Sequence, residues 1–541
     1  MPTYLPSIGF AEKVNKLMNN NSKYSRYVIY VIVISTIVRG LLAAILELGN
    51  DEVYYRLYAL YPDWSHFDHP LMVGLVMQIT TLNLLLQSEF FLRLGSLIIG
   101  AINLWIIFNI GKEIKDSKTG YYASLLYTAS VYSTIITGVF ILPDTPQSLF
   151  WLWAIYLIIK TVPECPHVPM SGINMLKVGI IIGLGILSKY TTVFLWFGIG
   201  IYILLYNREW LKSKWLYFSI ITTLIISLPI LIWNLQNDFI SLSFHSERVD
   251  MSGYLLNLNY FFTEIGGEIL YNNPINFILI ILGIVAGIRG KLDIEKKFTR
   301  VILLMGLPLI ITFLIFSLFR STLPHWTAPG YTTMILLAAV YLSQRRSKNK
   351  TGLPVVVASS IIFLLLTIVL GLAQIKLGLF KIDSTTEYNR IGKNDFSLDL
   401  YGYKQTGEAF GQIVKNDIEQ GIMSENTILI GTNWFPLANY DYYAASPAGL
   451  ASFGIGQLVN IHKYAWINNV QGGFTIGMDA YYITDSREYH RPDSIFYTYF
   501  EDVVPADTIQ IYRNGKVAKR AFIFRMKNLK TIPEDVLDAD N

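Results

Sequence analysis

Long runs of apolar residues alternate with short polar segments along the first 380 residues. A helix that crosses the hydrocarbon core of a bilayer needs about 20 residues, and fewer where it is short or partly buried. The pattern therefore predicts about eleven membrane-spanning helices. We place them at residues 27–48, 94–110, 119–140, 147–159, 178–187, 191–206, 215–234, 274–288, 301–319, 328–343 and 354–376.

Two apolar stretches need a separate decision. The stretch 71–87 is short and is interrupted by Gln78 and other polar residues, so we interpret it as an amphipathic juxtamembrane helix lying in the interface. The stretch 174–206 would be about 50 Å long as one helix, at a rise of about 1.5 Å per residue. Because Ser188 and Lys189 interrupt it near the middle, we divide it into two short spans.

The basic residues of the loops set the orientation of these helices. Cytoplasmic loops of membrane proteins are enriched in Lys and Arg, and the division above places most of the basic loop residues on the side of the N-terminus. We therefore expect a multi-pass protein of the cytoplasmic (inner) membrane, with a cytoplasmic N-terminus and a periplasmic C-terminus. The external loops are then 49–93, 141–146, 188–190, 235–273 and 320–326.

The pattern changes after about residue 380, where polar, charged and aromatic residues mix and no apolar run reaches spanning length. We interpret residues 1–380 as a transmembrane domain with external loops 49–93 and 235–273, and residues 381–541 as a soluble extracytoplasmic α/β domain. Its predicted elements are strands at 426–432 and 480–486, a hairpin over 508–524 around Asn514-Gly515, and a helix at 407–421.

Composition agrees with this assignment. Of 541 residues, 52% are hydrophobic and only 15% are charged, which is typical of a polytopic membrane protein. The net charge of +4 is small, and the basic residues follow the topology instead of forming a patch for nucleic acid. Cys165 is the one cysteine, which excludes an intramolecular disulfide and a multi-cysteine metal site.

Every short external turn carries an ionisable residue. Solvent-exposed loops ordinarily contain charged residues, and solvent exposure alone stays a possible explanation for each residue taken singly. It is weaker for the set, because two of the turns are only a few residues long between apolar helices, where an unpartnered charge is costly. The residues concerned are Asp51, Glu52, His66, Asp68, His69, Asp144, Lys189, His245, Arg248, Arg320 and His325.

Several of these residues lie in pieces that resemble a known family. The pieces are D-E-x-Y-Y at 51–55, F-D-H-P-L at 67–71, E-F-F-L-R-L at 89–94, L-P-D-T-P followed by F-W at 142–151, G-L-G-I-L-S-K-Y at 183–190, W-N with F-H-S-E-R-V at 233–249, and L-P-H-W-x-x-P at 323–329. In order and spacing they resemble the bacterial relatives of dolichyl-phosphate-mannose protein mannosyltransferases. These are membrane glycosyltransferases of the GT-C fold, and they include the aminoarabinose transferase of lipid A.

The resemblance implies an inverting glycosyltransferase that moves a sugar from a polyprenyl-phosphate carrier to an acceptor at the outer face of the membrane. The acceptor is a protein, lipid A or a glycan. Such a reaction needs a carboxylate to take a proton and cations to hold the leaving phosphate. Asp51 matches the family's catalytic aspartate, although a solvated aspartate at a helix end would look the same. Asp144 matches a second aspartate that orients the acceptor or the sugar, or it caps the helix after Pro143.

Further residues match positions that contact the substrate. Lys189 matches a basic residue that binds the carrier phosphate, and the alternative is a lysine that snorkels from a short helix. We also expect contacts to the substrate from Glu52, Tyr55, His69, Arg248, Arg320 and His325.

A divalent metal ion such as Zn²⁺ is a further expectation. Where relatives have glutamate followed by lysine, this chain has Asp68 and His69, and the resemblance implies Asp68 as a ligand together with His245. Two ligands do not complete a site. His66 and His69 either complete it or bind sugar hydroxyls.

Two other classes of function remain open. A secondary transporter or a flippase for a lipid-linked sugar also has about a dozen spans, but it usually places ionisable groups near the membrane midplane, which is almost free of charge here. A polysaccharide polymerase or ligase that uses a diphosphate-linked donor is the other alternative.

Overall fold

The structure is a computed structural model that describes residues 8–250, 255–345 and 353–537. The chain forms two compact units. The first comprises Met1–Ala44 and Asp63–Leu366, and the second comprises Ile45–Pro62 and Thr367–Asn541. The boundary that we predicted at residue 380 thus differs from the division in the structure, which also assigns the segment 45–62 to the second unit.

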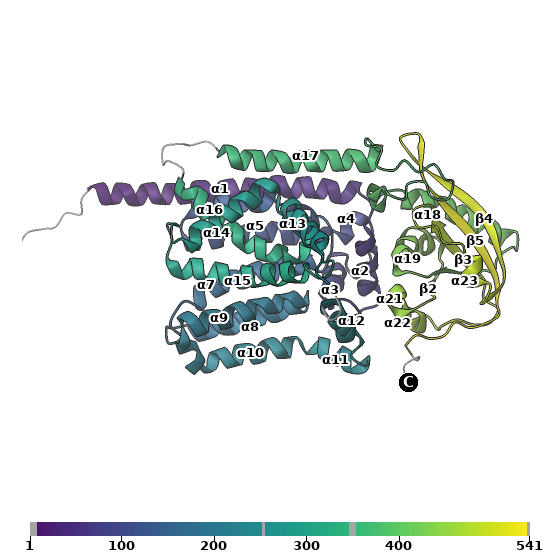
Figure 1. Cartoon of the computed structure of the whole chain (residues 1–541), viewed down its shortest axis with the longest axis horizontal. Coiled ribbons are helices and arrows are strands. Elements are labelled where there is room, and N and C mark those ends of the chain that lie inside the picture. The colour runs from purple at the N-terminus through teal and green to yellow at the C-terminus, as the bar shows by residue number, and fades with distance from the viewer. Residues whose placement is uncertain (1–7, 251–254, 346–352, 538–541) are drawn as a thin grey trace, which may run out of the picture. The chain divides into compact units, whose positions relative to one another are not determined.

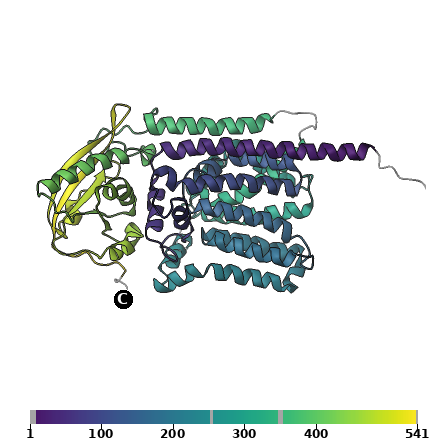
Figure 2. The ribbon, with the colours of Figure 1, turned by 180° about the vertical axis from the view of Figure 1, so that it is seen from behind.

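The first unit is a bundle of helices that run roughly along one direction (Figure 1, Figure 2). Each predicted span overlaps a helix or a bent pair of helices. The helices are α1 (Ile8–Ile45), α5 (Leu94–Ile114), α6 (Ser117–Ala129), α7 (Asp144–Thr161), α8 (Ser171–Ile186), α9 (Phe194–Tyr206), α10 (Lys214–Ile226), α11 (Leu228–Gln236), α14 (Pro274–Ile288), α15 (Lys296–Phe316), α16 (Ala328–Arg345) and α17 (Val355–Leu377), the last of which continues into the second unit.

Length and apolarity qualify only some of these helices as membrane spans by themselves. Within the described residues, 4 helices pass, and up to 6 spans result if each of two bent pairs counts as one. The bent pairs are α10 with α11, at 41°, and α13 (Leu258–Asn272) with α14, at 100°. The class of helical membrane protein is confirmed, whereas the number of about eleven spans stays a prediction.

Helix α16 packs against α6, α14 and α15. Nearly all of its side chains are buried. Small residues allow this close packing, because a Cβ atom added to Gly306 of α15 would lie 2.8 Å from the main-chain oxygen of Gly330 in α16. The ends of α16 are therefore held in place by three neighbouring helices.

The two stretches that needed a separate decision contain the predicted helices: a short helix in the first and two helices separated by a break in the second. In the stretch 71–87, α3 (Met72–Thr80) has 9 residues and is too short to cross a bilayer. It is followed by three residues with positive φ, Leu82 to Leu84. In the stretch 174–206, α8 ends at Ile186 and the chain resumes helical structure only after Lys189.

One predicted loop contains more structure than we expected. The segment 235–273 holds α12 (Ile240–Val249) and α13. Both are short and carry charged residues, so that neither matched the apolar runs by which we recognised helices. The segment that we interpreted as an external loop thus contains two helices, and its external position stays a prediction.

The second unit contains a five-stranded sheet with the strand order β2-β1-β3-β5-β4. Its first three strands in this order are parallel, and β5 pairs antiparallel with β3 and β4. The predicted strands, hairpin and helix are confirmed, whereas β2 was not predicted. The elements are β1 (Ile428–Gly431), β2 (Ser452–Gly454), β3 (Ala480–Asp485), β4 (Phe500–Arg513), β5 (Lys516–Leu529) and α18 (Tyr403–Glu419).

Candidate active site

A buried ion pair lies at the beginning of α7 in the first unit. The Nζ of Lys189 donates to a carboxylate oxygen of Asp144 at 2.8 Å, and the hydroxyl of Tyr132 donates to the other oxygen at 3.2 Å. Asp144 is 3% exposed and Lys189 is 5% exposed. Removing either charge would leave the other buried without its counter-charge, which is costly.

The local backbone explains how the two residues meet. Asp144 is the first residue of α7, directly after Pro143 at the N-cap position, and its carboxylate accepts from Lys189 and Tyr132. Lys189 has extended backbone angles (φ −158°, ψ 132°) in the break after α8. Its ammonium group is buried against Asp144 and does not snorkel.

His325 lies beside this ion pair. It belongs to the short 3-10 turn η4 (Pro324–Thr327), which comes directly before α16. Burial lowers the pKa of His325 to about 4; Asp144 acts in the opposite direction, and Lys189 lowers it further. The imidazole is therefore neutral at pH 7 and offers one donor and one acceptor nitrogen.

Positively charged and imidazole groups surround His69, in the loop that precedes α3. Burial lowers the pKa of His69 well below its ordinary value. Four neighbouring side chains lower it further: Lys189, His245, Arg248 and His325. Residues from four of the predicted external loops thus lie near one another. We call Asp144, Lys189, His69 and His325 the candidate site.

Asp68 and His245 lie next to the candidate site, but in an arrangement unlike the expected metal ligands. The Nε2 of His245 is 2.9 Å from the main-chain oxygen of Asp68, so this ring nitrogen already has a partner. Residues 8–250, 255–345 and 353–537 contain no group of three or more His, Cys, Asp or Glu side chains placed to hold a metal ion. Asp68 and His245 supply at most two ligands, so the metal expected there stays a prediction.

The two predicted arginines have structural contacts. The guanidinium of Arg248 lies over the ring of Phe244, 4.2 Å from its centroid. Arg320 donates through one terminal nitrogen to the main-chain oxygens of Glu247 and of Asp250, the latter at 3.0 Å. Arg320 therefore joins the end of α15 to the end of α12, and a phosphate contact from it stays a prediction.

Asp51, Glu52 and Tyr55 lie on α2 (Asn50–Leu60), which belongs to the second unit. Asp51 is exposed in the first turn of this helix. Glu52 accepts a hydrogen bond from the main-chain nitrogen of Gly49 at 2.8 Å and closes the helix N-terminus. Tyr55 is buried, and its ring centroid lies 5.4 Å from that of Tyr58. For Glu52 this helix cap is a role that we did not predict.

The sequence analysis missed two glutamates that hold the turn of His325. Glu264 and Glu268 are each 1% exposed on α13. Glu264 accepts from the hydroxyl of Thr322 at 2.7 Å, and Glu268 accepts from the hydroxyl of Tyr331 at 2.8 Å. Their spacing of four residues within F-F-T-E-I-G-G-E-I-L, which puts both on one helix face, was the available signal.

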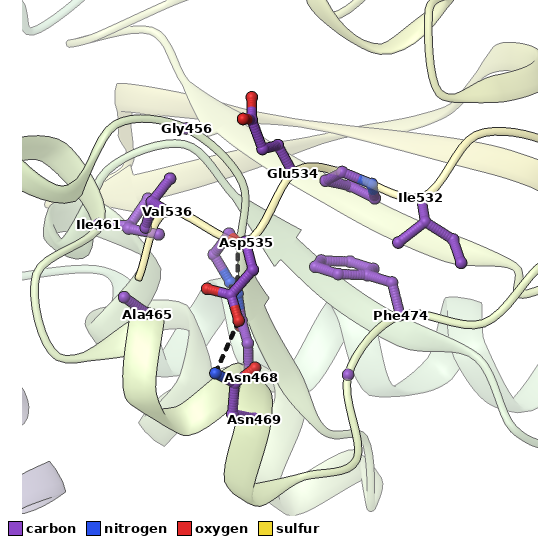
Figure 3. Close-up of a pocket in the computed structure, with 13 residues that line it drawn as sticks. Gly456, Ile461, Ala465, Asn468, Asn469, Phe474, Ile532, Glu534, Asp535 and Val536 are labelled. Carbon is purple, nitrogen blue, oxygen red and sulfur yellow. Dashed lines mark hydrogen bonds between the residues drawn. The ribbon is translucent and has the colours of Figure 1, made fainter. Parts of the chain in front are cut away.

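A cavity of about 190 Å³ in the second unit offers different chemistry (Figure 3). Phe474 and Ile532 line one side of it, and Asp535 accepts a hydrogen bond from the side-chain amide of Asn469 at 2.8 Å. Its described lining has no Lys, Arg or His. This cavity is therefore poorly suited to a phosphate, in contrast to the candidate site.

Two sequence comparisons identify similar proteins. The family described as dolichyl-phosphate-mannose-protein mannosyltransferase matches residues 68–233, less than half of the chain, and this range includes Asp68, Asp144 and Lys189. The lipid A galacturonosyltransferase RgtD of Rhizobium johnstonii is 22% identical over 408 residues, which are 74% of this chain and 80% of RgtD.

Solved structures decide the fold. The crystal structure of ArnT from Cupriavidus metallidurans in the apo state matches with a TM-score of 0.61 at 13% identity, over 93% of this chain and 98% of ArnT. The same protein bound to undecaprenyl phosphate matches with a TM-score of 0.60 at 14% identity and the same coverage. This chain has the GT-C fold of ArnT. The fold that the sequence pieces implied is thereby confirmed.

Proposed function

We propose that this protein is a membrane glycosyltransferase that moves a sugar from a polyprenyl-phosphate carrier to an acceptor at the outer face of the membrane. The relatives of known activity transfer sugars, and one matching structure holds undecaprenyl phosphate. The observation that carries the proposal is the convergence of Lys189, His69 and His325 beside the buried carboxylate of Asp144.

The charge distribution of the candidate site suits a departing phosphate. Lys189 is a buried cation with one carboxylate partner, and its ammonium group has three N–H donors, of which Asp144 accepts one. His69 and His325 are held neutral, so each presents an N–H donor without adding charge. Donors in a water-poor site stabilise an oxyanion far more than they would in water.

The oxygen of an acceptor hydroxyl attacks the anomeric carbon, the bond between this carbon and the phosphate oxygen breaks, and the bonding electrons leave with the carrier phosphate. Lys189, His69 and His325 hold the phosphate, and Asp144 keeps the ammonium group of Lys189 in position. A carboxylate takes the hydroxyl proton, and we assign this role to Asp51 from the sequence pieces. Attack opposite the leaving group inverts the anomeric centre.

The acceptor is the least determined part of the proposal. A lipid A acceptor receives support from the similarity to RgtD, whereas the family match supports a protein acceptor equally well. A glycan acceptor stays open as well. The candidate site argues for the donor phosphate, since its cations and imidazoles suit that group and not a particular acceptor hydroxyl.

The test uses the purified full chain in vesicles with a radiolabelled polyprenyl-phosphate sugar and a set of acceptors. We expect transfer of label together with release of polyprenyl phosphate. Asp51→Asn should abolish transfer while leaving expression and membrane insertion intact. The matched control is Asp502→Asn, an exposed aspartate on β4, which should retain activity.

Three results would contradict the proposal or part of it. Movement of the intact labelled carrier across the vesicle membrane, without cleavage, would identify a flippase. Transfer only from diphosphate-linked donors would identify a polymerase or ligase. Full activity of Asp51→Asn would overturn the assignment of the general base while leaving the reaction class intact.

A further inference from the structure

A second cluster of cations lies between the C-terminal ends of α14 and α16. It lines a cavity of about 370 Å³ and comprises Arg289, Lys291 and Arg345, which we call the cation pocket. Tyr341 and Gln344 of α16 complete its polar lining. The guanidinium of Arg345 lies 4.3 Å from the ring centroid of Tyr341, a cation–π contact that holds it at the mouth of the cavity.

No carboxylate lines the cation pocket within the described part of the chain. The two acids of the following loop have other partners: Asp293 pairs with Lys115 at 3.0 Å, and Glu295 pairs with Lys297 at 3.2 Å. Among the residues that the structure describes, three cations thus share one cavity without a counter-charge on its walls. The cavity therefore attracts an anion.

The turn that carries two of these cations is well held. The side-chain amide of Gln344 donates to the main-chain oxygen of Lys291 at 2.9 Å, and its oxygen accepts from the main-chain nitrogen of Asp293 at 2.8 Å. Both bonds tie the loop after α14 to the end of α16. The loop and the helix end that carry the cation pocket are therefore fixed to each other by hydrogen bonds.

An exposed apolar face leads to the cation pocket along α14. At spacings of three and four residues this face comprises Ile278, Ile281, Leu282, Val285 and Ile288, each at least 38% exposed. Leu282 and Val285 also line the pocket itself. In a membrane protein such a face contacts lipid chains, and it ends at the cations, where a lipid carries its headgroup.

The cation pocket is remote from the candidate site. His325 lies just before the first residue of α16, and Arg345 is its last residue. With 18 residues, the helix is about 27 Å long at a rise of about 1.5 Å per residue. This length is close to the thickness of the hydrocarbon core, so the two clusters lie at opposite ends of the bundle.

We propose that the cation pocket binds the phosphate of an anionic membrane lipid, with the lipid chains along α14. The carrier phosphate of the proposed reaction is a different ligand, because the candidate site that would bind it lies at the other end of α16. The enrichment of cytoplasmic loops in Lys and Arg explains why cations occur on this side, but not why three of them enclose a cavity at the end of an apolar face. The proposal does not depend on the proposed enzymatic function.

The test measures lipid retention by native mass spectrometry of the delipidated full-length protein in detergent. The probes are phosphatidylglycerol, phosphatidylcholine and inorganic phosphate. We expect retention of phosphatidylglycerol well above that of phosphatidylcholine. The double variant Arg289→Gln/Arg345→Gln should weaken its binding by about tenfold or more.

Two matched variants keep the result interpretable. Lys296→Gln/Arg208→Gln removes two exposed cations outside the pocket and should leave retention unchanged. Arg289→Lys/Arg345→Lys keeps the charges and should retain most of the binding. The proposal is overturned if the pocket variant binds phosphatidylglycerol as the wild type does, if both glutamine variants lose it equally, or if inorganic phosphate displaces the lipid at equal concentration.

Discussion

The two ends of α16 hold ionisable residues in opposite ways. At the N-terminal end, Lys189 is buried in a 2.8 Å ion pair with Asp144, and the histidines beside it are neutral. At the C-terminal end, Arg289 and Arg345 are exposed and line a cavity to which no carboxylate of the described residues contributes. At the N-terminal end the charges are paired within the protein, whereas at the C-terminal end the cations face a cavity that an anion from the surroundings can enter.

This difference between the two ends predicts how strongly a mutation at each end destabilises the folded protein. A buried charge depends on its partner, so removing one member of the Asp144–Lys189 pair leaves an uncompensated charge in the interior. An exposed cation is hydrated without a partner, so its removal costs the fold little. Substitutions should therefore destabilise the protein strongly at the first end and little at the second.

The largest effect is expected for Lys189→Gln. It should lower transfer activity by about 100-fold or more, because it removes the cation for the leaving phosphate. It should also destabilise the protein by about 3–5 kcal/mol, since Asp144 is left buried and charged. Activity assays and thermal unfolding in detergent measure the two effects.

The double variant Lys189→Gln/Asp144→Asn separates them. It removes both charges and should recover much of the stability but none of the activity. Recovery of activity along with stability would mean that Lys189 acts only as a structural partner of Asp144.

A smaller effect is expected for Gly267→Ala. A Cβ atom at this position of α13 would clash with the ring of Pro324, in the turn that carries His325. The expected cost is about 1–3 kcal/mol, together with reduced transfer activity. Gly266→Ala is the matched control, because nothing lies within 4 Å of its added Cβ, and it should stabilise the helix by about 0.5–1 kcal/mol. Equal effects of both variants would show that the α13 contact does not position His325.

His325 predicts a dependence of stability on pH. Its pKa is about 4 in the folded protein, below the ordinary value of 6.5. Between these values the unfolded chain binds a proton that the folded chain does not, so the free energy of unfolding falls as the pH is lowered. Protonation of His325 in the unfolded chain should lower the free energy of unfolding by about 2 kcal/mol between pH 7 and pH 5. Thermal unfolding between pH 7 and 5 should show a smaller decrease for His325→Gln than for the wild type, and identical slopes would contradict the assignment.

The smallest effect is expected at the other end of α16. Arg289→Gln should change stability by no more than about 0.5 kcal/mol and leave transfer activity in lipid-free detergent unchanged. A large loss of stability would show that this cation has an acidic partner, and the contrast between the two ends would fail. The measurement is thermal unfolding beside the Lys189→Gln variant.

Much of the fold was predictable because long apolar runs mark the helical segments that lie in lipid. Each of the predicted spans overlaps a helix, and the hairpin at Asn514-Gly515 is where its turn residues indicated. Helices α12 and α13 were missed because they are short and partly charged, so apolar length does not reveal them. The inclusion of residues 45–62 in the second unit depends on contacts distant in sequence, such as that between Arg56 and Asp441 at 3.7 Å.

The candidate site was predictable as a set of residues but not in its pairing. The sequence pieces selected Asp144, Lys189 and His325, which the structure brings together. The pairing of Lys189 with Asp144 depends on packing between helices, which no local sequence pattern encodes. The same holds for the bond between Tyr331 and Glu268 near the turn of His325. The role of Asp51 as a general base stays a prediction, as does the metal expected at Asp68 and His245.

Binding of the reaction's carrier product tests the central claim most directly. The affinity of undecaprenyl phosphate is measured for the purified wild type, for Lys189→Gln and for Lys160→Gln, a surface lysine at the other end of α7. Lys189→Gln should bind the phosphate about 10–100-fold more weakly, as expected for the loss of one charge-assisted contact, and Lys160→Gln should bind as the wild type does. Unchanged affinity in folded Lys189→Gln would contradict the account.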